Sequence, residues 1–132
     1  MTHELAVRVW YEDTDLAGIV YYANYLKYIE RGRSDLVARA GVDQGALARD
    51  GGLVFAVREV HARYLAPARL GDDLTVRTTV YETGPVRMVF DQAVWRGEVV
   101  LFTATVTVVC VHQSGRPLRV PAEIRQKIET IA

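Results

Sequence analysis

The spacing of apolar residues changes along the first third of this chain. Apolar and polar residues alternate over residues 5–11, which predicts a strand because successive strand side chains point to opposite faces. After Gly18, apolar residues recur every three or four positions as far as Ala40, as on one face of a helix. Gly32 lies within this face, where a close approach to a sheet would explain a residue that disfavours helix. Gly41 is placed to cap the end of a helix of about 19 residues, roughly 28 Å long.

Beyond Gly52 the chain is rich in Val, Thr, Phe and Tyr, which favour strands. The segments with this composition are residues 53–64, 74–81, 86–95 and 99–112. Short turn-forming breaks between them suit hairpins, so the strands are predicted to be antiparallel. A further helical turn or two is expected over residues 42–51, and a short terminal helix over residues 121–131.

This order predicts one α+β domain over residues 1–132, with a long helix on a five-stranded antiparallel sheet. In the last strand Ala104 and Val106 face one side, whereas Val109 and Val111 make the other side apolar as well. One helix covers only one face of such a sheet, so apolar surface is left over. Self-association is the simplest way to bury it.

Charge and composition narrow the function classes. The chain has 16 basic and 16 acidic side chains, so its net charge gives no general argument for binding nucleic acid or an anionic membrane surface. Its single cysteine, Cys110, excludes an intramolecular disulfide and a Cys-rich zinc site. Neither a signal peptide nor a membrane span is expected, which predicts a cytoplasmic protein. Cys110 itself is expected to be a small buried side chain.

Residues 11–25, YEDTDLAGIVYYANY, carry the chemistry. Asp13 and Asp15 precede the predicted long helix, whose first N–H groups lack internal acceptors and favour a negative oxygen. A carbonyl placed there would have its developing oxyanion stabilised by an N–H near Tyr22, while a carboxylate attacks the carbon or deprotonates a water. A loop turn or a complement to the helix dipole is the alternative, and the residues alone favour it. The D-x-D pair is not a convincing metal site.

The segment V-R-V-W-Y-E-D-T-D-x-x-G-I-V-Y-Y-A-N-Y-L resembles the signature of the 4-hydroxybenzoyl-CoA thioesterase family of hotdog-fold proteins. Within that family it looks most like the YbgC-type acyl-CoA thioesterases associated with the Tol–Pal system. The similarity continues in residues 64–74, which fit the family pattern Y-x-x-P-A-x-x-x-D-x-L, and in residues 108–111 and 119–121. It therefore covers nearly the whole chain.

The resemblance implies a hotdog fold, in which the sheet wraps the long helix, and a homodimer or homotetramer with active sites at the dimer interface. It implies hydrolysis of an acyl-CoA, with coenzyme A as part of the substrate and no bound cofactor or metal. The catalytic carboxylate falls on Asp15, as general base or as nucleophile. The backbone N–H that polarises the carbonyl falls on Tyr22, and Gly18 permits the tight loop between them.

One residue departs from the pattern. Many YbgC-type members have histidine where this chain has Tyr22, so a backbone role survives here but an imidazole role does not. His3 is expected in a mobile terminus, and His61 and His112 at surface or packing positions. These placements argue against hotdog dehydratases and hydratases, which need a histidine paired with an acidic residue. The rings of Tyr22 and Tyr25 are expected in the core.

Two other functions stay open. A non-catalytic hotdog protein could bind an acyl carrier or a cell-envelope partner as a scaffold. An acyl carrier protein could also replace coenzyme A as the carrier, with the same chemistry at the thioester.

Overall fold

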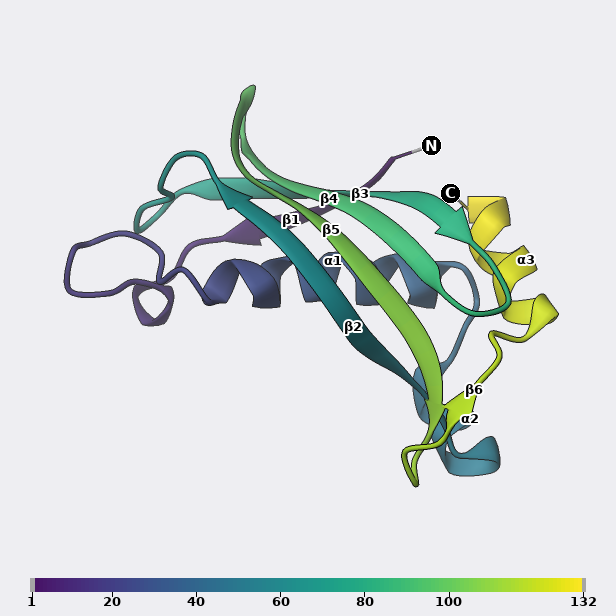
Figure 1. Ribbon diagram of the computed structural model, residues 1–132. Helices are drawn as coiled ribbons and strands as arrows, with labels where there is room; N and C mark the ends of the chain where they lie inside the picture. Colours follow the sequence, from purple (N-terminus) through teal and green to yellow (C-terminus); the bar gives the residue numbers. More distant parts are fainter. Residues whose placement is uncertain (1, 132) are drawn as a thin grey trace.

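The computed structural model describes residues 2–131 and contains one antiparallel sheet with three helices (Figure 1). Five strands follow the order β1-β3-β4-β5-β2, and a short strand, β6, pairs with β5. The strands are β1 (His3–Arg8), β2 (Leu53–Tyr64), β3 (Asp73–Thr83), β4 (Met88–Arg96), β5 (Val99–His112) and β6 (Pro117–Leu118). The helices are α1 (Asn24–Arg39), α2 (Gln44–Gly51) and α3 (Ala122–Ile131). The predicted long helix and antiparallel sheet are confirmed, with β6 as an addition.

The first strand was predicted too far along the chain. β1 begins at His3 and ends at Arg8, and its whole length pairs with β3. The Val9 N–H then donates to the Asp72 carbonyl oxygen at 2.9 Å, outside the ladder. A single turn of 3₁₀ helix follows over Tyr11–Asp13, so the alternation of residues 9–11 belongs to a bend.

Helix α1 starts later than the apolar spacing predicted and has 16 residues. Ile19 forms an isolated bridge with Arg69, and the Val20 N–H donates to the Ala68 carbonyl oxygen at 2.9 Å. Because this pairing holds the backbone extended, the helix cannot begin directly after Gly18. Its end is as predicted, because Gly41 follows the C-cap residue Ala40. The φ of Gly41 is +88°, in the left-handed region that glycine adopts freely.

Helix α1 lies along one face of the sheet, where it packs on β1, β3 and β4 (Figure 1). Helix α1 and strand β3 come very close at Gly32. A Cβ atom added there would lie 2.7 Å from Val76 Cγ1 and 3.1 Å from Thr78 Oγ1. The predicted reason for a glycine in this helix is therefore confirmed, since any side chain would collide with β3.

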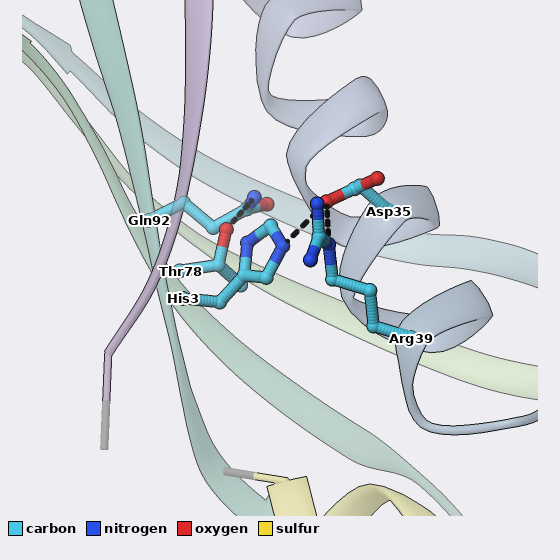
Figure 2. Close-up of polar contacts among 5 residues, drawn as sticks. All are labelled: His3, Asp35, Arg39, Thr78 and Gln92. Atoms are coloured by element: carbon cyan, nitrogen blue, oxygen red, sulfur yellow. Dashed lines mark hydrogen bonds and ion pairs between the residues drawn. The ribbon is translucent and has the colours of Figure 1, made fainter.

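A buried hydrogen-bond network lies beside Gly32. Figure 2 shows Gln92, from β4, reaching Thr78 on β3. Gln92 Nε2 donates to Thr78 Oγ1 at 2.9 Å and to the Ile29 carbonyl oxygen of α1 at 2.8 Å. Its Oε1 accepts from Arg33 at 2.9 Å. Since Gln92 is only 3% exposed, these bonds are what make its burial tolerable.

An ion-pair cluster lies one helical turn further along (Figure 2). Asp35 Oδ2 accepts from His3 Nε2 at 2.7 Å and from Arg39 Nε at 2.8 Å. The expectation that His3 belongs to a mobile terminus is wrong, because β1 pairs with β3 from His3 onward and its side chain is largely buried. This cluster ties the start of β1 to the second half of α1.

The core fills the space between α1 and the sheet face that it covers, and the residues of β5 alternate about it. Phe102, Ala104, Val106 and Val108 are buried, whereas Val109 and Val111 are half-buried on the other face. Cys110 is buried as predicted, and burial raises the pKa of its thiol to about 11. None of the helices in the described chain is long and apolar enough to span a membrane.

Candidate active site

Asp15 is the first residue of a tight turn that Gly18 closes. Its N–H donates to the Ile19 carbonyl oxygen at 2.9 Å, and its carbonyl oxygen accepts from the Gly18 N–H at 3.0 Å. Gly18 has a φ of +79°, the left-handed conformation expected of a glycine that closes this loop. The Asp15 side chain is exposed, and its Oδ1 accepts from the Ala17 N–H at 2.9 Å. The second oxygen, Oδ2, has no partner within residues 2–131 and faces solvent.

Asp13, the other half of the D-x-D pair, has a structural position. Its Oδ2 accepts from the Trp10 N–H at 2.8 Å and closes the 3₁₀ turn. Its carbonyl oxygen accepts from the Tyr21 N–H and from Asn24 Nδ2, both at 2.9 Å. Asp13 therefore joins the loop to the start of α1, and Asp15 is the more exposed carboxylate of the pair.

Tyr22 lies in the turn that leads into α1, just before the N-cap residue Ala23. The turn is closed by the Asn24 N–H, which donates to the Tyr21 carbonyl oxygen at 2.8 Å. Within the described residues the Tyr22 N–H meets no acceptor, so it remains available to an incoming oxygen. Tyr22 lies two residues before the first residue of α1, and its role as the oxyanion donor stays a prediction.

The Asp15 carboxylate and this turn lie near one another. The pKa of the Tyr21 phenol is raised, chiefly by the adjacent Tyr22 phenol, then by burial and lastly by the Asp15 carboxylate. The two tyrosine rings are 4.9 Å apart between centroids. The loop thus holds the Asp15 carboxylate close enough to the Tyr21 side chain for its charge to act on that phenol.

A cavity of about 340 Å³ opens beside Tyr22. Its walls come from the loop, the start of α1 and the chain after β2, namely Ile19, Val20, Tyr22, Tyr25, Tyr64, Leu65, Ala66 and Pro67. The prediction that the Tyr22 ring is in the core is wrong, since it is 63% exposed at this cavity. Tyr25 is buried as predicted, at 3% exposure.

Sequence reasoning gave no role to the wall residues at the end of β2 and after it. Residues 64–68 were noted only because they fit a family pattern, and that pattern was the available signal. The structure brings them to the site through Tyr25, whose hydroxyl accepts from the Ala68 N–H at 2.9 Å. The Tyr25 ring also stacks on Phe102, with centroids 5.1 Å apart. The hydrogen bond from Ala68 to Tyr25 therefore fixes residues 64–68 against the start of α1.

Comparisons with known proteins show the family of this chain. Residues 9–128 match the model of the thioesterase-like superfamily. The acyl-CoA thioesterase YbgC of Haemophilus influenzae is 37% identical over 120 residues, which are 90% of this chain and 88% of that protein. The acyl-CoA thioester hydrolase YbgC of Escherichia coli is 40% identical, and the match covers 89% of each chain.

Solved structures show the same architecture. The crystal structure of a probable thioesterase from Bartonella henselae superimposes with a TM-score of 0.87 at 33% sequence identity. The match covers 92% of this chain and all of that one, 100%. The expected hotdog fold is therefore confirmed.

Proposed function

The chain belongs to the thioesterase-like superfamily, and from that premise we propose that it hydrolyses an acyl-coenzyme A to a free acid and coenzyme A. The observation that carries the proposal is that one short segment holds an exposed carboxylate and, seven residues later, an N–H without an acceptor among the described residues, on a residue that lines an apolar cavity. Asp15 supplies the carboxylate and Tyr22 the N–H. The YbgC relatives, which are named for this reaction, support the choice of substrate.

In the proposed reaction the acyl carbonyl oxygen accepts a hydrogen bond from the Tyr22 N–H. Asp15 then acts by one of two routes. As a base it removes a proton from a water that attacks the carbonyl carbon, and the C–S bond breaks as the proton passes to the thiolate. As a nucleophile it forms an acyl anhydride with release of the thiol, and water hydrolyses the anhydride. Both routes consume one water and need no cofactor or metal.

Labelling separates the two routes. In a single turnover in oxygen-18 water, the nucleophilic route places label in the Asp15 carboxylate when water attacks the Asp15 carbonyl of the anhydride. The base route places solvent oxygen only in the acid product. Mass spectrometry of the peptide that contains Asp15 measures the difference.

We also propose that the working form is a homodimer or homotetramer in which a second subunit completes each site. The support is the free edge of β2, the last strand in the sheet order. Val57 and Val60 on this strand are 49% and 38% exposed. A long edge strand presents unpaired N–H and C=O groups that can pair with a strand of another chain. Light scattering should give at least a dimer, and a monomer at working concentrations would contradict a shared site.

The central test is Asp15→Asn, assayed by thiol release from short, long and aromatic acyl-CoAs and from acyl carrier protein thioesters. We expect kcat to fall at least about 10²-fold, because the variant lacks the base or nucleophile. Glu12→Gln is the matched control, since it removes an exposed carboxylate from the same segment. It should leave kcat close to that of the unmodified protein.

The outcomes assign the function. Unchanged turnover in Asp15→Asn would exclude the proposed mechanism. Turnover with acyl carrier protein thioesters alone would replace coenzyme A as the carrier. No turnover with any thioester would favour the scaffold function instead.

A further inference from the structure

One hydrogen bond joins the end of β2 directly to the turn before α1. The Tyr64 hydroxyl donates to the Tyr22 carbonyl oxygen at 2.9 Å, across 42 residues of sequence. Tyr64 is the last residue of β2, and its ring also forms part of the cavity wall. The contact therefore reaches the residue whose N–H is the proposed oxyanion donor.

Hydrogen bonds hold the backbone on both sides of the Tyr22 Cα atom. On one side, the Tyr21 carbonyl oxygen accepts from the Asn24 N–H at 2.8 Å. The carbonyl and the N–H of one trans peptide point in opposite directions, so this bond turns the Tyr22 N–H away from Asn24. On the other side, the Tyr22 carbonyl oxygen accepts from Tyr64. Without Tyr64, the Asn24 contact would still fix the Tyr21–Tyr22 peptide plane, but the Tyr22–Ala23 plane would lose its hydrogen bond.

The Tyr64 ring is itself fixed by an aromatic cluster. It meets Phe102, Tyr25 and Tyr22 edge to face, with centroids 5.0, 5.5 and 6.2 Å away. Such pairs restrict ring orientation as well as burying apolar area. Burial, followed by the neighbouring phenols of Tyr22 and Tyr25, raises the pKa of the Tyr64 hydroxyl, so it keeps its proton and remains a donor at neutral pH.

We propose that Tyr64 is a positioning residue for thioester hydrolysis. Its hydroxyl holds the Tyr22–Ala23 peptide, while the Asn24 N–H holds the Tyr21–Tyr22 peptide that carries the donor N–H. Tyr64 thus restricts the backbone rotation at Tyr22 that would turn this N–H away from the acyl carbonyl oxygen, and it does so without touching the reacting atoms. This inference rests on the proposed function of Asp15 and Tyr22. The ring and the hydroxyl have separate effects, because the ring forms the cavity wall and the hydroxyl fixes the backbone.

The test compares Tyr64→Phe with Tyr64→Leu on the acyl-CoA that the unmodified protein turns over best. Tyr64→Phe keeps the ring and removes the hydrogen bond, so kcat should fall about 10-fold while KM stays within about twofold. Tyr64→Leu also removes the aromatic wall, so KM should rise in addition to the loss in kcat. The matched control is Tyr81→Phe, which alters a 71% exposed tyrosine on β3 and should change neither constant.

The possible results separate this inference from the proposed function. A kcat of Tyr64→Phe equal to that of the unmodified protein would overturn the positioning role and leave the function standing. A lower unfolding temperature with unchanged kcat would make the bond merely structural, which also overturns it. Absence of turnover in the unmodified protein would overturn the proposed function, and this inference with it.

Discussion

The beginning and the middle of α1 are built in opposite ways. In the middle, Gly32 lets the helix touch β3, and Gln92 satisfies polar groups on both elements in a buried network. At the beginning, the Tyr22 N–H has no acceptor among the described residues and the neighbouring Asp15 carboxylate is exposed. The helix is thus fixed to the sheet in its middle, while the turn and loop before it keep an N–H without a described acceptor and an exposed carboxylate.

Apolar side chains show the same contrast. Most of the exposed large apolar residues of the described chain lie between β1 and the start of α1 or at and after the end of β2, namely Trp10, Tyr11, Leu16, Tyr21, Tyr22, Leu26, Tyr64, Leu65 and Leu70. The others are Val57, Val60, Tyr81, Val86 and Val99. An exposed apolar surface costs stability in an isolated chain and marks a place where something binds. Stability should therefore reside in the middle of α1 and activity at its beginning. Substitutions in the middle should change the free energy of unfolding and leave turnover nearly unchanged.

The largest effect on stability is expected for Gln92→Leu. This variant leaves the Thr78 hydroxyl and the Arg33 guanidinium without their buried partner, so the free energy of unfolding should fall by about 2–3 kcal/mol. Gln126→Leu, at an exposed position on α3, is the control and should change it little. Denaturant titration measures both.

A second substitution sharpens this prediction. Thr78→Val added to Gln92→Leu replaces a stranded hydroxyl with an apolar group of the same shape and should recover part of the loss. Turnover per folded molecule should stay within about twofold, because Arg33 lies roughly 14 Å along the helix from Asn24. A large loss of kcat in a fully folded Gln92→Leu protein would break the division between the two regions.

A smaller loss is expected for Gly32→Ala. The new Cβ would lie 2.7 Å from Val76 Cγ1, a stiff β-branched side chain in the core, so the helix or the strand must shift. Overpacking of this kind outweighs the gain in helix propensity, and the net loss should be about 1–2 kcal/mol. The control is Gly45→Ala in α2, where the nearest atom is an ordinary 3.4 Å away. Calorimetry that found equal stabilities for the two variants would show that β3 yields at this contact.

The sequence predicted most of the fold because most of it follows from local patterns. The bounds of β2 and β5, the reason for Gly32 and the cap at Gly41 all follow from periodicity or from single residues. The start of α1 could not be predicted in this way. It depends on the pairing of Ile19 with Arg69, two residues 50 positions apart that share no local pattern.

In the candidate site, too, the features that follow from local sequence were predicted and those that depend on long-range contacts were not. Asp15 and Tyr22 were identified through a contiguous family motif, and their catalytic roles stay predictions. In the structure each carboxylate of the D-x-D pair accepts one backbone N–H. The exposed ring of Tyr22 and the contact from Tyr64 were missed. Both depend on how the end of β2 meets the turn before α1, which no spacing within either segment reveals.

The smallest effect is expected at the ion-pair cluster of Asp35. The Arg39 guanidinium, and after it His3, hold the pKa of the Asp35 carboxyl below its ordinary value of 3.8. A lowered pKa means that the folded protein favours the ionised carboxylate, so the stabilisation is present above pH 3.8 and disappears as the pH falls below it. Asp35→Asn should therefore lower the free energy of unfolding by less than about 1 kcal/mol near neutral pH.

The pH dependence of that difference is the decisive measurement. The curves of unfolding free energy for Asp35→Asn and the unmodified protein should converge as the pH is lowered through the folded pKa of Asp35. Arg39→Gln should cost little in the Asp35→Asn background, because its partner charge is already gone. Turnover at neutral pH should not change, since the cluster lies in the second half of α1, away from Tyr22. A stability difference that widened toward low pH would mean that folding raises the pKa of Asp35 instead of lowering it, and the ion pair would then contribute nothing to holding β1 on the helix.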